Sequence, residues 1–189
     1  MARFMILALA AGLIGAATSV QAAELVLGKG LAEKCYENAI LERFSANALD
    51  DCDAALNAGD LGVRDRAATL VNRGIILKQT GRVEDALESY GEALQLRPDM
   101  AEAYLNRGAV FLQLNRFVEA IDAINAGLGL DPEQPARGYF NRGLAYEELG
   151  DVEAAYNDYV EASRLAPEWG APVRELERFN VLVQPQSGP

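Results

Sequence analysis

The sequence predicts an all-α fold in which antiparallel helix pairs stack into a solenoid. The first observation is an Asn-Arg-Gly triplet at residues 72–74 that recurs at 106–108 and 141–143, so the period is 34 or 35 residues. The second is that each triplet lies in a segment with helical spacing of apolar residues, closed by a turn-forming residue. A period of this length is typical of helical repeat architectures.

Each repeated marker has a physical reason. Residues 67–80 have helical periodicity, and Gly81 ends that helix because glycine readily adopts a left-handed C-terminal cap. A second amphipathic helix follows over residues 83–96, and Pro98 ends the pair since it cannot continue a helix. The small residues Gly74 and Ala86 allow the two helices to approach closely where they cross. The same markers recur in the later units as Gly108, Asn115, Ala120 and Pro132, and as Gly143, Gly150, Ala155 and Pro167.

These markers resemble the tetratricopeptide repeat. Its pattern has an aromatic or large residue at position 4, Gly at 8, Tyr at 11, Ala at 20, an aromatic residue at 24, Ala at 27 and Pro at 32. With residues 67, 101 and 136 as position 1, the units are 67–100, 101–135 and 136–169. The best match is the third unit, with Tyr139, Gly143, Tyr146, Ala155, Tyr159, Ala162 and Pro167. The resemblance implies a right-handed superhelical solenoid whose concave side is lined by the first helix of each unit.

The ends of a solenoid need caps because each unit buries its faces only against neighbours. Residues 23–66 are predicted to form a degenerate N-terminal helical hairpin, and residues 170–183 a C-terminal capping helix. Pro172 lies where a proline in the first helical turn is tolerated. The last residues, 184–189, are predicted to be a disordered tail.

The two cysteines, Cys35 and Cys52, fall in the predicted N-terminal hairpin. A disulfide between them requires a shortened hairpin with its turn near residues 43–44. The register of the family would place the turn near residues 46–47 and the two cysteines out of reach of each other. The alternative is a pair of buried free thiols that act as small apolar packing residues.

Residues 1–22 have the pattern of a cleavable export signal. Arg3 precedes an unbroken run of apolar and small residues over 4–17, and small residues occupy positions 20 and 22. The small residues therefore predict cleavage between Ala22 and Ala23. A membrane anchor is disfavoured because the apolar run is shorter than the roughly 20 residues that span a bilayer. We expect a periplasmic protein, with secretion as the alternative, and no membrane insertion after cleavage.

Composition limits the functions that need consideration. Acidic residues outnumber basic ones by 28 to 17, and this excess disfavours nucleic acids and anionic lipids as partners. The chain contains no histidine, the commonest general base and transition-metal ligand. No calcium-binding loop is visible either. We therefore expect no catalysis, no cofactor and no metal.

The predicted concave face carries the candidate binding residues. Position 6 is asparagine in every unit, and an amide that both donates and accepts can pair with the backbone of a bound segment. The alternative is that each asparagine holds a neighbouring turn. Apolar residues at positions 5, 9 and 12 would form a floor beside this row, and Arg137 would add charge at its edge. The full set is Asn72, Asn106, Asn141, Val71, Leu105, Phe140, Ile75, Leu112 and Arg137.

Two other charged patterns have simpler interpretations. The carboxylate clamp of chaperone adaptors is largely absent, because its first-unit residues fall on Val71 and Ile75. Only Asn106 and Arg137 match it, and Asn141 occupies the place of an arginine. The repeated Arg73, Arg107 and Arg142 are expected to form salt bridges within the solenoid, with acids of the second helices such as Asp85 and Glu119. The sequence thus predicts an interaction module that binds a peptide or partner segment in its groove. The alternative is a structural subunit that docks through its convex face or its edges.

Overall fold

The computed structural model describes residues 30–183, in which every regular element is an α-helix. The predicted signal segment, its cleavage site and the predicted C-terminal tail lie outside these residues. Residues 30–40 form the first helix. The helices that follow are α2 (Ala46–Ala58), α3 (Val63–Gln79), α4 (Val83–Leu96), α5 (Ala101–Gln113), α6 (Phe117–Leu128), α7 (Pro135–Glu148), α8 (Val152–Leu165) and α9 (Gly170–Val183).

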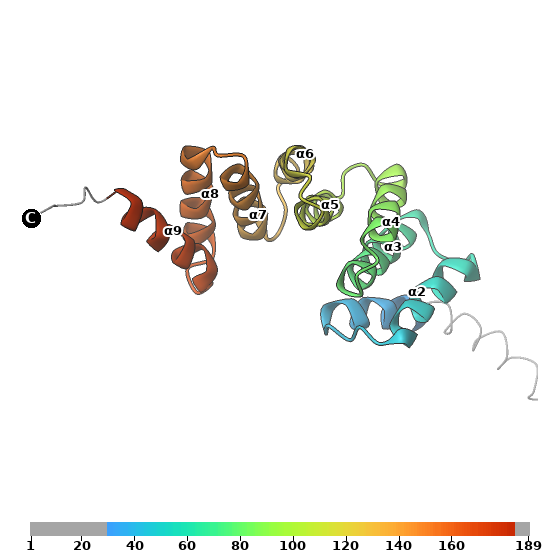
Figure 1. Ribbon diagram of the computed structural model, residues 1–189. Coiled ribbons are helices and arrows are strands. Elements are labelled where there is room, and N and C mark those ends of the chain that lie inside the picture. Colours follow the sequence, from blue (N-terminus) through green and yellow to red (C-terminus); the bar gives the residue numbers. More distant parts are fainter. Residues whose placement is uncertain (1–29, 184–189) are drawn as a thin grey trace, which may run out of the picture.

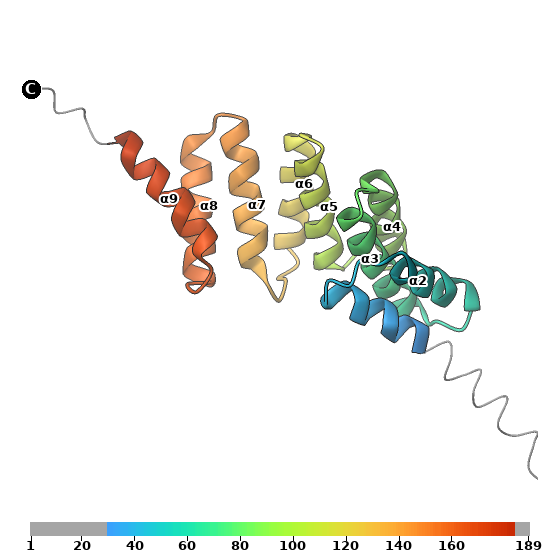
Figure 2. The same ribbon diagram turned by 60° about the horizontal axis from the view of Figure 1, so that its bottom comes forward.

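The helices form antiparallel pairs arranged in series, so the predicted all-α solenoid is confirmed (Figures 1 and 2). The tightest packing is within the pairs α3–α4, α5–α6 and α7–α8, and each pair also packs against the next. One boundary differs from the predicted unit, because α3 begins at Val63 directly after Gly62. Asp65 in its first turn favours this earlier start, since a carboxylate stabilises the positive end of the helix dipole.

The three predicted turn markers share one backbone conformation. Gly81, Asn115 and Gly150 have φ values of 82°, 56° and 80°, in the left-handed region that glycine and asparagine tolerate best. The residue after each marker donates its amide to a carbonyl of the preceding helix. These hydrogen bonds are Arg82 N to Leu77 O at 2.9 Å, Arg116 N to Phe111 O at 2.8 Å and Asp151 N to Tyr146 O at 2.9 Å.

The repeated glycines lie where the two helices of a pair approach most closely. A Cβ atom added to Gly74 would overlap the ring of Tyr90, and one added to Gly143 would overlap the ring of Tyr159. At Gly108 the side chain of Ile124 occupies the corresponding place. Position 8 is therefore small because the large residue at position 24 of the second helix packs directly against it.

Helix α9 packs against α8 at the C-terminal end of the solenoid. Its Phe179 is only 5% exposed, and the centroid of its ring lies 5.9 Å from those of both Tyr156 and Tyr159. Helix α9 therefore covers part of the face that α8 would otherwise offer to a further unit.

Candidate binding face of the solenoid

The first helices of the units lie closer to one another than the second helices do. Helix α3 contacts α5, and α5 contacts α7, whereas α4, α6 and α8 make no comparable contact with one another within the described residues. The inner side of the curve is therefore formed by α3, α5 and α7. A segment bound there would meet side chains from three successive units.

The asparagines at position 6 occupy this inner face, one on each of α3, α5 and α7. Asn72, Asn106 and Asn141 are all half-buried. Nothing in the described part of the chain forms a hydrogen bond with any of their side chains, so none of them holds a turn there. Each amide consequently keeps both a donor and an acceptor for another molecule.

The apolar residues at position 5 also pack against other elements of the solenoid. Val71 is 6% exposed and belongs to the core around α3 and α4. The δ-methyl group of Leu105 lies against Gly127 of α6 and Gly138 of α7. The centroid of the Phe140 ring lies 4.8 Å from that of Trp169. Leu105 and Phe140 nevertheless remain partly exposed, so the apolar strip beside the asparagines stays a prediction.

Ile75 is partly buried and packs against the core around α3 and α4. Leu112 is also partly buried and packs against the cluster that contains Phe111 and Ala120. The inner face therefore combines the asparagine row with apolar side chains that are partly exposed.

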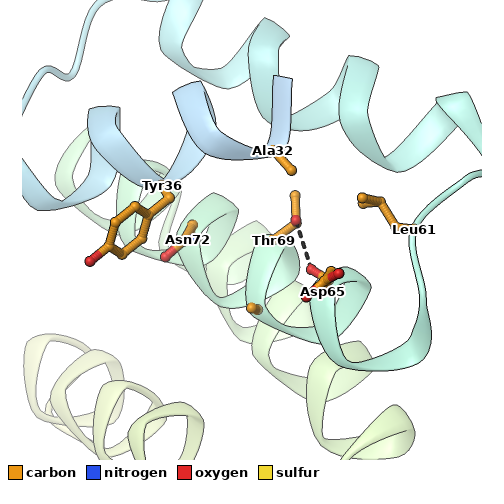
Figure 3. A pocket seen from close by; sticks show the side chains of 7 residues that line it. Ala32, Tyr36, Leu61, Asp65, Thr69 and Asn72 are labelled. Carbon is orange, nitrogen blue, oxygen red and sulfur yellow. Dashed lines mark hydrogen bonds between the residues drawn. The ribbon is translucent and has the colours of Figure 1, made fainter. Parts of the chain in front are cut away.

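A cavity of about 380 Å³ lies at the N-terminal end of the inner face, between helical residues 30–40 and α3. Its lining residues, all drawn in Figure 3, are Ala32, Tyr36, Leu61, Asp65, Ala68, Thr69 and Asn72. Tyr36 is 52% exposed and forms part of the rim, and Thr69 donates a hydrogen bond to the carbonyl of Asp65 at 2.8 Å. Sequence reasoning missed this cavity because it depends on how the degenerate hairpin packs against the first complete unit.

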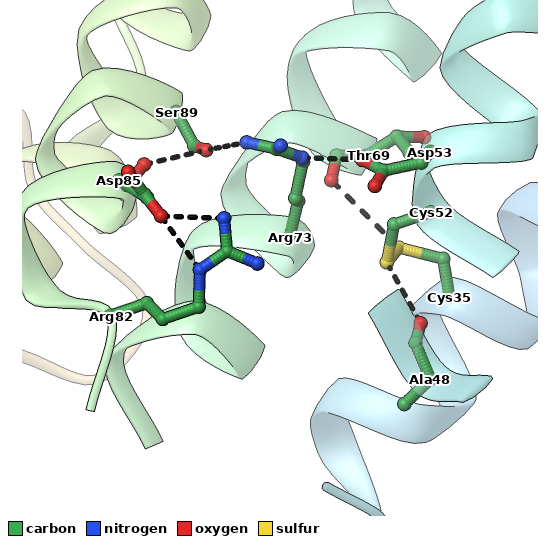
Figure 4. Close-up of polar contacts among 9 residues, drawn as sticks. All are labelled: Cys35, Ala48, Cys52, Asp53, Thr69, Arg73, Arg82, Asp85 and Ser89. Atoms are coloured by element: carbon green, nitrogen blue, oxygen red, sulfur yellow. Dashed lines mark hydrogen bonds and ion pairs between the residues drawn. A yellow bond between two sulfur atoms is a disulfide. The ribbon is translucent and has the colours of Figure 1, made fainter. Parts of the chain in front are cut away.

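Cys35 and Cys52 form a disulfide, with their Cα atoms 4.8 Å apart (Figure 4). The first helix ends at residue 40 and α2 begins at Ala46, so the hairpin is shortened as the bond requires. The sulfur of Cys35 lies 3.8 Å from the carbonyl oxygen of Thr69. This is a packing contact, because an oxidised sulfur has no proton to donate.

Two of the three repeated arginines form salt bridges within the solenoid. Arg73 pairs with Asp53 of the preceding hairpin at 2.6 Å and donates to the hydroxyl of Ser89 at 2.7 Å (Figure 4). Arg142 makes a bidentate pair with Asp158, at 2.7 and 2.8 Å. In the second unit, the guanidinium of Arg107 lies 5.7 Å from the centroid of the Phe111 ring.

The acids expected to pair with these arginines were wrongly predicted. Asp85 pairs with Arg82, and Glu119 pairs with Arg116, at the start of their own helices. Residues three apart on a helix are nearest neighbours, so these local partners lie closer than the arginines of the first helices.

Lys78 and Arg137 bring positive charge to the inner face from α3 and α7. Burial lowers the pKa of the half-buried Lys78 ammonium, and the nearby guanidinium of Arg137 lowers it further. On the third unit, Glu147 accepts a hydrogen bond from the Tyr159 hydroxyl at 2.8 Å and pairs with Arg178 at 2.6 Å. The Glu147 carboxylate is therefore partnered within the protein.

Comparison with known proteins identifies the repeat. The sequence profile of one tetratricopeptide repeat family matches residues 71–135, and that of a second matches residues 136–169. The two matches together cover more than half of the chain. The chain belongs to the tetratricopeptide repeat (TPR) family. TPR proteins are generally non-catalytic interaction modules. The search of curated proteins finds no match.

Several solved structures share the fold. A double mutant of MamA RS-1 is 25% identical, with a TM-score of 0.67 and 84% of each chain covered. MamA 41-end from Desulfovibrio magneticus RS-1 is 24% identical, with a TM-score of 0.66, and the match covers 84% of this chain and 85% of that one. The first TPR of Spaghetti (RPAP3), bound to the HSP90 peptide SRMEEVD, is 23% identical, with a TM-score of 0.58 and 62% and 92% covered.

Other types of site receive no support from the described residues. Residues 30–183 contain no cluster of three or more acidic or cysteine side chains that could hold a metal ion. No helix in this range is long and apolar enough to cross a membrane. The asparagine row and the adjoining cavity are the best candidates for function.

Proposed function

We propose that this TPR protein binds an extended segment of a partner protein along the inner face of α3, α5 and α7, in the bacterial envelope. The observation that carries the proposal is the row of half-buried, unpartnered amides of Asn72, Asn106 and Asn141. A partly exposed amide that pairs with no group of its own protein keeps a donor and an acceptor for a ligand. Amides that have none are suited to pair with the backbone of another chain.

Structures with the same fold support a segment as the ligand. The first TPR of Spaghetti (RPAP3) is bound to an HSP90 peptide, and the second TPR domain of human RPAP3 is in complex with an HSP70 peptide. The cavity beside Asn72 extends the inner face of this chain toward its N-terminal hairpin. A side chain of the bound segment can enter it, and this would fix the register of the segment along the asparagine row.

The envelope location rests on two features. The Cys35–Cys52 disulfide suits an oxidising compartment, since cytosolic thiols are kept reduced. The sequence of residues 1–22 has the pattern of a cleavable export signal. The periplasm satisfies both requirements.

A structural subunit of an envelope assembly is the second candidate. The observation that favours it is an exposed apolar stripe on α8, formed by Val152, Tyr156 and Val160, which are 53%, 41% and 40% exposed. Val152 corresponds to Val83 of the first unit, which the following unit buries to 8% exposure. In this alternative, a neighbouring subunit would cover the stripe and the inner face would stay empty.

Substitution of the central asparagine tests the proposal. Partners captured from an envelope extract are identified, and the affinity of each purified partner is measured for the wild type and for Asn106→Ala. We expect Asn106→Ala to weaken binding by roughly 1–3 kcal/mol, because a desolvated backbone group of the partner loses its hydrogen bond. Asn157→Ala, at an exposed asparagine of α8, is the matched control and should bind normally.

Melting curves of both variants exclude misfolding as the cause of lost affinity. Val152→Asp separates the two candidates, since it charges the α8 stripe without touching the inner face. Unchanged affinity for Asn106→Ala together with weakened binding by Val152→Asp would reject the groove in favour of the structural subunit.

A further inference from the structure

The cavity at the N-terminal end of the inner face contains a carboxylate. Asp65 is the one charged residue among those that line it. Asp65, Ala68 and Asn72 are three and four residues apart on α3, so they share one face of that helix and form one wall of the cavity (Figure 3). The asparagine row therefore continues, on the same helix face, into a space that ends at a negative charge.

The facing wall belongs to the first helix, which carries Ala32 and Tyr36 one turn apart. The disulfide between Cys35 and Cys52 ties this helix to α2. The sulfur of Cys35 also packs on the carbonyl oxygen of Thr69 in α3, at 3.8 Å (Figure 4). Both walls are therefore held in place before a ligand binds.

The Asp65 carboxylate has no cationic partner in the described part of the chain. The side chain of its neighbour Arg66 donates to the carbonyl of Leu56 at 2.8 Å instead. Neither Arg66 nor Arg64 lines the cavity. Asp65 itself is exposed, so its charge can be reached from solvent.

The later units do not repeat this arrangement. Helix α3 begins at Val63, so Asp65 lies in its first turn. The equivalent residue of the second unit, Asp99, precedes α5 and pairs with Arg97 at 2.7 Å. In the third unit the equivalent residue is the neutral Gln134. Among the three units, the first alone thus places an acid without an ion-pair partner in residues 30–183 beside its asparagine.

The chemistry of the cavity suits a cation with an apolar stem. The N-terminus of α3 carries a partial positive charge of about half a unit, which the full negative charge of Asp65 exceeds. The net charge of −11 also attracts positively charged segments. Ala32, Leu61 and Ala68 offer apolar surface on which the methylene groups of a lysine or arginine can pack.

The length of the cavity wall suits a long side chain. Asp65 and Asn72 are seven residues apart, which corresponds to about 10 Å along the axis of α3. A segment whose backbone pairs with Asn72 needs a side chain that spans this distance to reach Asp65. An extended arginine or lysine does so when a hydrogen bond of about 3 Å completes its reach.

We propose that the cavity binds one basic side chain, arginine or lysine, of the segment bound on the inner face. The stem lies between Ala32 and Ala68, and the charged end pairs with Asp65. This inference rests on the proposed function, because the asparagine row holds the backbone of the segment. It adds a selection for a basic residue that amides paired with a backbone cannot make.

Capped amino acids test the cavity without the rest of a segment. The ¹⁵N-labelled protein is titrated at constant ionic strength with Nα-acetyl-arginine amide, with its neutral isostere Nα-acetyl-citrulline amide and with Nα-acetyl-leucine amide. We expect a saturable shift of the Asn72 side-chain amide with the arginine compound. Its Kd should be roughly threefold lower than that of the citrulline compound, the effect of one partly exposed ion pair. The Asn141 amide should respond weakly and without saturation.

Three variants test the composition of the site. Asp65→Asn should raise the Kd of the arginine compound roughly threefold and leave that of the citrulline compound unchanged. Glu102→Gln, which removes an exposed acid from the first turn of α5, is the matched control and should bind both compounds as the wild type does. Ala68→Leu fills the middle of the cavity and should abolish the Asn72 shift with every compound. Melting curves show whether each variant is folded.

Two results would overturn the proposal. One is equal affinity of the wild type for the arginine and citrulline compounds, or unchanged arginine affinity in Asp65→Asn. The other is tighter binding of the leucine compound, which would assign the cavity to an apolar side chain.

The outcomes separate this inference from the proposed function. Asn106→Ala should lose affinity for the captured partner while its Asn72 signal still responds to the arginine compound. Loss of partner affinity in Asn106→Ala, with no arginine response in the wild type, retains the groove and rejects the basic side chain. Unchanged partner affinity in Asn106→Ala, with a normal arginine response, rejects the groove and retains the cation site.

Discussion

Tyr90 and Tyr159 occupy equivalent places in two units, yet only Tyr159 has a hydrogen-bond partner. Burial raises the pKa of both phenols, and at Tyr159 the hydrogen bond to Glu147 raises it further. Both hydroxyls therefore stay protonated and able to donate at neutral pH. The family pattern predicts an aromatic residue at this position but carries no information about its hydroxyl partner.

Tyrosine-to-phenylalanine substitutions form a matched pair. Tyr159→Phe should lower the free energy of unfolding by about 1 kcal/mol, because it removes a hydrogen bond that is made. Tyr90→Phe should leave stability unchanged or raise it, since it removes a buried hydroxyl that has no partner in the free protein. Urea denaturation of both variants measures the difference. Equal losses would show that the Tyr90 hydroxyl is satisfied after all.

The buried ion pair of Arg142 and Asp158 should contribute more to the free energy of unfolding than the ion pairs on the surface. The Asp158 side chain is 8% exposed, so Asp158→Ala leaves a largely buried guanidinium without its bidentate partner. We expect a loss of about 3 kcal/mol in the free energy of unfolding. Asp85→Ala, which breaks an exposed pair, should cost at most about 0.5 kcal/mol. Thermal or urea unfolding compares the two, and similar losses would contradict the role given to burial.

At the scale of elements, the sequence predicted the turns and the close helix contacts, because these depend on local chemistry. Gly81, Asn115 and Gly150 mark the turns because the chain needs a left-handed residue there, and Gly74, Gly108 and Gly143 mark the closest helix approaches. The sequence was less informative about side chains whose packing depends on a neighbouring element. Leu105 reads as a groove residue from its helix face, but its side chain also packs into the space beside the glycines at 127 and 138, which leaves it only partly exposed.

The register of the N-terminal hairpin could not be predicted from the repeat pattern alone. The family register and a disulfide could not both hold, and the shortened turn between residue 40 and Ala46 satisfies the disulfide. The degenerate repeat pattern there is too weak to enforce its own register, so the covalent bond and the buried cysteines determine it.

Removal of the disulfide should destabilise this hairpin first. The two cysteines are 17 residues apart, and a loop of this size gives about 2–4 kcal/mol of stabilisation. Cys52→Ser should reduce the free energy of unfolding by that amount, and hydrogen exchange should become faster in residues 30–58 before α5–α8. Two freely alkylated thiols in the native exported protein would contradict the bond.

At the scale of the whole molecule, curvature creates the candidate site. The first helices contact one another along the inner side, so residues far apart in sequence, such as Asn72 and Asn141, share one face. The period of the repeat predicts this arrangement. The cavity beside Asn72 depends on how the N-terminal hairpin packs against the first unit, which no single repeat encodes.

Export is a prediction that rests on the pattern of residues 1–22. The pattern of residues 1–22 predicts a mature N-terminus at Ala23. Intact mass measurement of the exported protein should therefore find the first 22 residues missing. Recovery of the full-length chain from the membrane fraction would contradict cleavage.

The central claim is that a partner segment lies on the inner face, and side-chain amide NMR tests it most directly. The ¹⁵N-labelled protein is titrated with the partner identified by capture, and the amide signals of Asn72, Asn106 and Asn141 are followed beside that of Asn157. We predict large, saturable shifts at the first three and at the backbone of α3, α5 and α7, with Asn157 unmoved. Shifts confined to α4, α6 and α8, with the three inner amides unchanged at saturation, would contradict the account.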